Sequence, residues 1–366
     1  PETGSKDYTF TFYLKDKKSK EYTLKKTVTV YAPVFTLETT ENDAFARRLV
    51  LRAKMPIGNK EKLGFEYKEV NETDWTRVMS PELKQIGNDV TGILKGITPE
   101  TKYVVRAVYN AGKRIGNTEI TVTTEKEIAL VNGDFEDKWT EKNISGLMNG
   151  AKVGSEVSLT SSVPNGWVSV NDKTFSGKKT TMGLVLSTYN SVPSTMKVDG
   201  QGSGSGVRLR TVGWSNSKTA GNSDIKLFHV ASGRLFLGSY SFDHENDKDS
   251  YNYGVEFESR PSKVSAMYKY TPYNNDSFKV WAVVENRDGD TVTQLGIGEL
   301  VEGKSISDWQ KLSFDITYTN FTKRATHISI VFSSSSKCSD NESEETANLK
   351  SMVVNGEVDG YTHYEG

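Results

Sequence analysis

Period-two alternation of apolar and polar residues runs through most of this 366-residue chain, and it restricts the fold to β-sheets. YTFTFYLKD (8–16), ARRLVLRAKM (46–55) and SFKVWAVVEN (277–286) all alternate in this way. No segment keeps apolar residues at helical spacing beyond two turns. The length is that of two or three β-sandwich domains. We therefore predict an all-β, multi-domain protein.

The first domain-like segment, residues 1–33, holds two alternating stretches on either side of the turn-like KDKKSK (15–20). They predict a hairpin. A hairpin cannot bury a core alone, so we expect either the remnant of an upstream Ig-like domain or an addition to the next domain. Pro1 is not an initiator residue, so we expect a piece of a longer polypeptide, and a missing leader says nothing about compartment.

Residues 34–126 form a second domain-like segment. Leu49, Leu51 and Ala53 alternate onto one face, and a corner-like segment follows that carries Leu94, Ile97, Pro99, Thr101 and Tyr103. This segment resembles the corner between two strands of the fibronectin type III family, where a tyrosine hydroxyl bonds back to nearby backbone. The resemblance implies an Ig-like spacer module with Trp75 in its core. A fold of this kind does not by itself give a function.

Residues 127–366 form the largest predicted domain. About ten short alternating runs are separated by clusters of Gly, Ser, Asn and Asp. Many strands without helices predict two packed antiparallel sheets. At this size we expect a large jelly-roll β-sandwich.

Composition excludes several partners. The chain has 46 Lys and Arg against 47 Asp and Glu, so no basic field draws nucleic acid to it. No apolar run approaches the ~20 residues that span a bilayer. Cys338 is the single cysteine, so the chain has no internal disulfide.

Aromatic residues are the best indication of a binding site. Trp139, Trp167 and Trp214 each follow turn-like or polar residues in the large domain. A ring beside hydrogen-bonding groups suits a sugar, which has C–H bonds on one face and hydroxyls at its rim. The alternative is that these rings cap the ends of the core.

A second set of rings extends the predicted site. Tyr268 and Tyr270 share one strand face by period two, and Trp281 lies on the next alternating segment. We expect these three rings to line one groove that holds a glycan.

Carboxylates open further possibilities. The acidic segment SFDHENDKDSYN (241–252) reads most simply as a solvated turn, but it also holds carboxylates for calcium or for glycoside hydrolysis. The hydrolase alternative rests on Asp243, Glu245 and Glu256. Asp134 and Glu136 are candidate calcium ligands, with turn capping as the alternative. We expect no cofactor to be required.

Three stretches of the large domain form a recognisable series. They are VNGDFEDKW (131–139), GRLFLGSYSF (233–242), and a strand that ends in Arg260 and Pro261 before Tyr268, Lys269 and Tyr270. On these stretches the large domain resembles the putative carbohydrate metabolism domain of gut-type Gram-negative surface lipoproteins. The resemblance implies a secreted or lipid-anchored protein of a glycan-using bacterium, at the cell surface, on the outer membrane or outside the cell, with any anchor on a missing N-terminal part. Arg260 thereby joins the ligand-binding candidates. The family usually closes with one more strand, where this chain stops at THYEG (362–366).

These patterns favour a surface or secreted protein that holds a poly- or oligosaccharide by ring stacking and hydrogen bonds. The alternatives are a glycoside hydrolase with paired carboxylates and an adhesin or structural subunit that binds protein. The sequence leaves the choice of glycan open.

Overall fold

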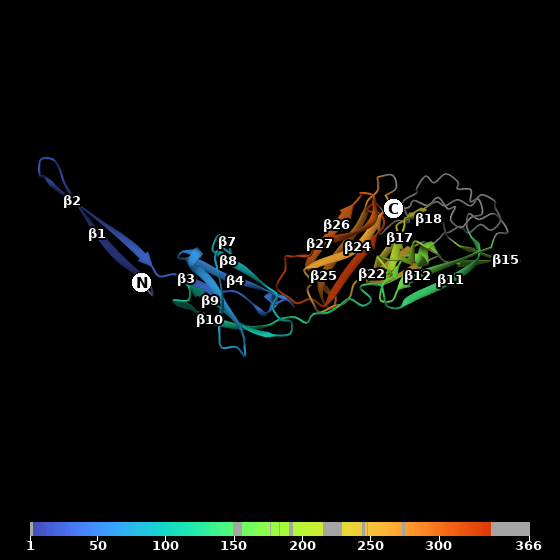
Figure 1. Cartoon of the computed structure of the whole chain (residues 1–366), viewed down its shortest axis with the longest axis horizontal. Helices are drawn as coiled ribbons and strands as arrows, with labels where there is room; N and C mark the ends of the chain where they lie inside the picture. The colour runs from blue at the N-terminus through green and yellow to red at the C-terminus, as the bar shows by residue number, and fades with distance from the viewer. Residues whose placement is uncertain are drawn as a thin grey trace. The chain divides into compact units, whose positions relative to one another are not determined.

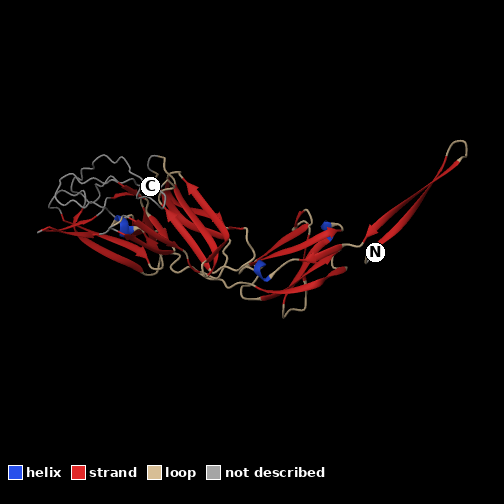
Figure 2. Ribbon diagram, turned by 180° about the vertical axis from the view of Figure 1, so that it is seen from behind, coloured by secondary structure: helices blue, strands red, loops and turns tan. Residues whose placement is uncertain are grey.

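The computed structural model describes residues 3–148, 156–175, 177–182, 184–189, 193–214, 229–243, 246, 248–272 and 275–337 (Figure 1). The chain divides into two compact units, Pro1–Glu127 and Ile128–Gly366. Figure 2 shows that the regular secondary structure of the described residues is almost entirely strand, with helix only in short pieces between the loops. These are two 3-10 turns, η1 (Glu41–Asp43) and η2 (Lys60–Lys62), and α1 (Asn171–Thr174). The all-β prediction is confirmed.

The first two strands form the predicted hairpin. β1 (Ser5–Lys15) pairs antiparallel with β2 (Glu21–Tyr31) through eleven residue pairs without a bulge. At the turn, the Asp16 carboxylate accepts hydrogen bonds from the backbone N–H groups of Lys18 and Lys20, which fixes the register. Every residue of β2 is exposed, and so is every residue of β1 except Thr11.

The rest of the first unit is a sandwich of two four-stranded antiparallel sheets. The strands of the first sheet are, in order, β3 (Val34–Leu37), β4 (Arg48–Ile57), β8 (Asp89–Lys95) and β7 (Lys84–Ile86). The strands of the second are β10 (Arg114–Thr123), β9 (Lys102–Tyr109), β5 (Leu63–Glu69) and β6 (Thr76–Met79). The alternating residues Leu49, Leu51 and Ala53 are buried between the sheets, as their spacing predicts.

The tyrosine corner is present in this sandwich. The buried Tyr103 hydroxyl accepts a hydrogen bond from the Thr98 backbone N–H (3.1 Å) and donates one to Glu69 (3.2 Å). The core position expected for Trp75 is wrong. Its ring is partly exposed and stacks on the Arg106 guanidinium, 3.8 Å from the ring centroid, because it lies outside the sheets rather than between them.

The second unit is built around a seven-stranded sheet. In order, its strands are β13 (Val168–Ser169), β20 (Arg234–Phe236), β29 (His327–Ser333), β25 (Phe278–Asp288), β26 (Thr291–Glu302) and β28 (Thr317–Tyr318), with β23 (Val255–Glu256) also paired to β29. A four-stranded sheet consists of β12 (Glu156–Pro164), β11 (Trp139–Met148), β15 (Leu184–Tyr189) and β14 (Gly177–Met182).

Among the described residues, four two-stranded ribbons complete this unit. They are β16 (Thr195–Asp199) with β17 (Ser205–Leu209), β18 (Val212–Trp214) with β19 (His229–Ala231), β21 (Gly238–Asp243) with β22 (Lys248–Tyr253), and β24 (Lys263–Tyr270) with β27 (Ile306–Asp315). The main core lies between one face of the seven-stranded sheet and the β24–β27 pair. From β25 it receives Phe278, Val280, Ala282 and Val284, which alternate along the strand.

Candidate functional site

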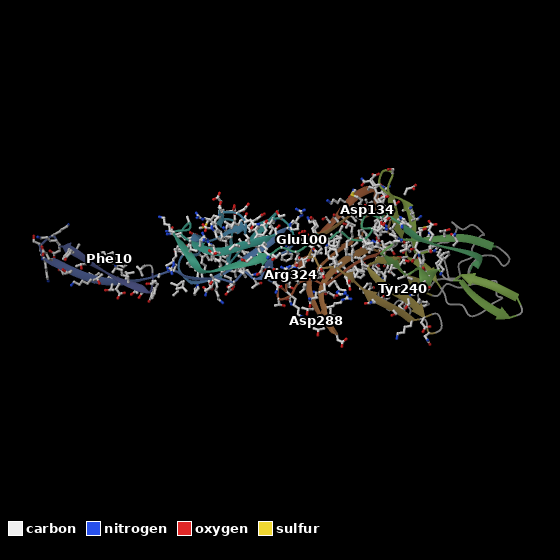
Figure 3. The ribbon with its side chains drawn as sticks, turned by 90° about the horizontal axis from the view of Figure 1, so that it is seen from below. Phe10, Glu100, Asp134, Tyr240, Asp288 and Arg324 are labelled. Carbon is white, nitrogen blue, oxygen red and sulfur yellow. The ribbon has the colours of Figure 1, made fainter. Side chains whose placement is uncertain are left out.

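The outer face of the seven-stranded sheet, opposite the core, carries a row of aromatic rings. Phe236 of β20 contacts Tyr253 and Tyr251 of β22, with centroids 4.9 and 6.0 Å apart. Tyr251 and Tyr253 stack at 5.5 Å, and Tyr253 meets Trp281 of β25 edge to face at 6.3 Å. The aromatic row is continued by Tyr240 of β21, which is labelled in Figure 3. The β21–β22 ribbon therefore lays its aromatic side on this face of the sheet.

Beside Trp281 the outer face of β25 and β26 stays open. The register pairs Lys279 with Val301, Trp281 with Glu299 and Val283 with Ile297, so these six side chains lie on one face. We call them the Trp281 platform. Trp281 is partly exposed, and Ile297 and Val301 are 40% and 49% exposed. The platform is thus a flat apolar area at the end of the aromatic row.

Charged groups frame the ring of the platform. The Lys279 ammonium lies 5.5 Å from the Trp281 ring centroid and 2.9 Å from a carboxylate oxygen of Glu299. Both side chains are partly exposed to solvent. A hydrogen-bond donor over the indole ring, and the acceptor that it contacts, therefore lie next to Trp281.

A buried polar cluster anchors the β21–β22 ribbon. Lys173 of α1, whose side chain is completely buried, donates to Asp249 of β22 (2.9 Å), and the Tyr240 hydroxyl donates to the other oxygen of that carboxylate (2.5 Å). Burial, and next the nearby Asp249 charge, raise the pKa of Tyr240, so its hydroxyl remains a donor. The cluster ties α1 to the ribbon that carries Tyr251 and Tyr253.

The position of Tyr253 depends on the residue that follows it. Gly254 has φ of +102°, and a Cβ atom there would lie 2.7 Å from the Arg287 guanidinium. Glycine thereby lets Arg287 donate to the Tyr253 carbonyl (2.6 Å), while Arg234 donates to the Tyr253 hydroxyl (3.1 Å). Hydrogen bonds from arginines therefore fix both the backbone carbonyl and the side-chain hydroxyl of Tyr253.

The three rings expected to line one groove are not brought together. Tyr268 and Tyr270 contact Phe278, at 5.2 and 4.9 Å, and all three rings pack on the core side. Trp281 is three residues beyond Phe278 on β25 and faces the opposite side of the sheet. The predicted groove is therefore wrong. Burial, and next Asp276, raise the pKa of Tyr270 to about 12.

Trp139 and Trp167 donate their indole hydrogen bonds to backbone carbonyls of the turn near the start of the second unit. Trp167 is buried in the core, and its indole N–H donates to the Asn132 carbonyl (3.2 Å), so it is not placed to meet a ligand. Trp139 is partly exposed; its N–H donates to the Phe135 carbonyl (3.1 Å), and the Lys197 ammonium lies 5.0 Å from its ring. Trp214 ends β18, and its side chain lies outside the described residues.

The remaining candidates lie apart from the platform strands. Arg260 is buried, which makes it inaccessible to a glycan. Asp243 accepts hydrogen bonds from Asn246, Glu256 is exposed on β23, and Glu245 lies outside the described residues.

Both calcium candidates accept backbone hydrogen bonds. Asp134 accepts from the Glu136 N–H (3.2 Å), and Glu136 accepts from the Ser205 N–H (2.8 Å). Among the described residues, no three His, Cys, Asp or Glu side chains gather as a metal site requires. A calcium site at Asp134 and Glu136 stays a prediction.

Sequence reasoning missed most of the aromatic row and its anchor. Tyr251 and Tyr253 have the same period-two spacing as Tyr268 and Tyr270, so that spacing was a usable signal. Lys173 lies 76 residues from Asp249, and no local pattern links the two.

Fold and site together define a β-sandwich protein with an aromatic, partly open sheet face. Residues 134–349, more than half of the chain, match the family model of the putative carbohydrate metabolism domain. The chain belongs to this family. A comparison with curated proteins finds no match. Within the described part of the chain, no helix has the length and hydropathy to cross a membrane.

Three solved structures are similar at low identity. The first concerns carbohydrate-binding modules of the β-sandwich superfamily with promiscuous specificity (8% identity, 82% of this chain and 90% of that one, TM-score 0.22). The second is the CBM22-1–CBM22-2 tandem of Paenibacillus barcinonensis Xyn10C (10%, 94% and 89%, 0.19). The third is the FN1–FN3 segment of chicken CNTN1 (9%, 80% and 94%, 0.18). These TM-scores are low, and the family assignment depends on the sequence match alone.

Proposed function

We propose that the second unit binds carbohydrate on the Trp281 platform. The observation that carries this proposal is the partly exposed indole with an ion pair next to it, on an otherwise apolar sheet face. A pyranose ring stacks its C–H face on an indole, and its hydroxyls need donors and acceptors at the rim. Lys279 and Glu299 supply one of each. Membership in the putative carbohydrate metabolism domain family supports the same substrate class.

The platform is flat, so it suits one or two sugar rings of a longer chain. Few contacts form there, and the expected dissociation constant is on the order of micromolar to millimolar. Before a sugar ring can stack on the indole face that the Lys279 ammonium covers, the ammonium has to move away, which costs about 0.5–1 kcal/mol. A protein that holds polysaccharide this weakly acts where polysaccharide is abundant, so we propose a cell-surface or extracellular location.

The test is retention on a panel of soluble polysaccharides by affinity electrophoresis, followed by calorimetry on the best ligand. Trp281→Ala removes the stacking surface, and we expect affinity to fall at least ~10-fold, from a loss of about 1.4 kcal/mol or more. Trp309→Ala is the matched control, because Trp309 of β27 is also partly exposed, with the Lys269 ammonium 5.1 Å from its ring, but lies outside the platform.

Two results would count against the proposal. Equal weakening by Trp281→Ala and Trp309→Ala would show that the platform is not the site. Release of new reducing ends by the unaltered protein would favour the hydrolase alternative, with Asp243 and Glu256 the first carboxylates to replace.

A further inference from the structure

The hairpin of β1 and β2 has one mostly polar and one mostly apolar face. The mostly polar face carries the exposed Tyr13 and Tyr31 near its two ends. Between them, Thr9 bonds to Thr27 (3.0 Å) and Thr29 donates to Asp7 (2.6 Å). The opposite face carries four aromatic and four aliphatic side chains; the longer ones are Tyr8, Phe10, Phe12, Leu14, Tyr22 and Leu24. We call this the hairpin apolar face; Phe10 is labelled in Figure 3.

This face is large for a surface left in water. Its eight side chains are 40–68% exposed, which amounts to about 700 Å² in all, at roughly 150–250 Å² for each aromatic side chain and about 150 Å² for each aliphatic one. A monomer rarely exposes an apolar patch of more than about 300–600 Å². A stable interface needs about 800 Å² from each partner. A two-stranded ribbon is also only marginally stable by itself.

We propose that the hairpin apolar face binds the same face of a second copy of this chain, independently of carbohydrate binding. Two such faces provide nearly the area of a standard interface, and two-fold pairing is the commonest symmetry of such contacts. Two ribbons with the same twist pack face to face about 10 Å apart, at about −30°. The result is a four-stranded sandwich with its apolar side chains inside.

Lys26 on this face selects one of two arrangements. Lys26 pairs with Phe10 at the middle of the eleven-pair ribbon, and none of the residues on this face of the described hairpin is acidic. If β1 lay over the partner's β1, Lys26 would face the partner's Lys26, and two like charges would be buried. If β1 lies over the partner's β2, Lys26 faces the partner's Phe10, where a cation–π contact is available. The geometry points to the second arrangement.

The first test is sedimentation velocity of the 366-residue chain from 1 to 100 µM. We expect a concentration-dependent dimer. Phe12→Asp places a carboxylate in the apolar face and should weaken dimerisation at least ~100-fold. Thr11→Asp, one residue away on the polar face, is the matched control and should leave the dimer intact. Circular dichroism melting of all three proteins checks that the sandwiches stay folded.

The second test fixes the arrangement with a short bis-thiol cross-linker in a Cys338→Ser background. A mixture of Phe12→Cys and Leu24→Cys chains should cross-link, while Phe10→Cys alone should not, because only the rejected arrangement places residue 10 opposite its own copy. A chain that remains monomeric at 100 µM overturns the proposal. So does a dimer that Phe12→Asp leaves unchanged.

Discussion

The buried ion pair between Lys173 and Asp249 gives the sharpest stability prediction. The Lys173 side chain has no exposed surface, and that of Asp249 is 5% exposed, so Asp249→Asn leaves an ammonium in the interior without its carboxylate. Removal of one partner of a buried pair costs about 3–5 kcal/mol of unfolding free energy. For a unit of about 240 residues, each kcal/mol lowers Tm by about 2–4 °C. We therefore expect the second unit to melt about 10 °C lower.

Differential scanning calorimetry measures this shift, with the first unit as an internal reference whose transition should not move. The double variant Lys173→Met with Asp249→Asn removes the uncompensated charge as well, so it should recover most of the loss. The reasoning is refuted if Asp249→Asn lowers the unfolding free energy by less than about 1 kcal/mol, or if the double variant is as unstable as the sum of the single ones.

Two further predictions separate stability from binding. Burial alone would raise the pKa of Glu66, but hydrogen bonds from Arg77 and Arg106 hold that pKa below its usual value. The ionised Glu66 and its two arginines therefore stabilise the first unit above pH 4.5, and less as pH falls. Glu66→Gln should therefore lower the Tm of the first unit at pH 7, by an amount that shrinks below pH 4.5 in melts across pH 3–7. Trp167→Ala should cost about 3–5 kcal/mol of unfolding free energy yet leave glycan affinity unchanged at 15 °C, as calorimetry would show.

Alternation along the chain predicts strands well because it reports burial directly. Leu49, Leu51 and Ala53 are buried as their spacing predicts, since only one face of their strand meets the core. The tyrosine corner at Tyr103 was also predictable, because its hydroxyl bonds within five residues of the chain. In both cases a single segment of the chain contains the information, either as a short-range contact or as a complete alternating pattern.

Alternation alone does not tell which side of a strand turns toward the core. Tyr268 and Tyr270 share a side of β24 in any arrangement, but only the pairing of β24 with β27 and the packing against Phe278 turn that side toward the core. A shift of one residue would reverse it. Trp281 belongs to an equally regular strand and faces outward. The choice between a binding ring and a core ring is therefore made by tertiary contacts.

The acidic segment at 241–252 shows that a pattern of charges likewise does not tell which carboxylate is buried. Its residues 241–243 and 248–252 belong to β21 and β22, where Asp249 pairs with Phe242 and faces the sheet, while Asp243 pairs with Lys248 and faces solvent. A solvated turn describes Asp243 but not Asp249. Because Asp249 faces inward with Tyr251 and Tyr253, its bond to Lys173 holds the aromatic row on the sheet. Loss of the Lys173–Asp249 bond should therefore make the tyrosines next to Trp281 more mobile before the second unit unfolds. Glycan binding should then weaken at temperatures where the second unit is still folded.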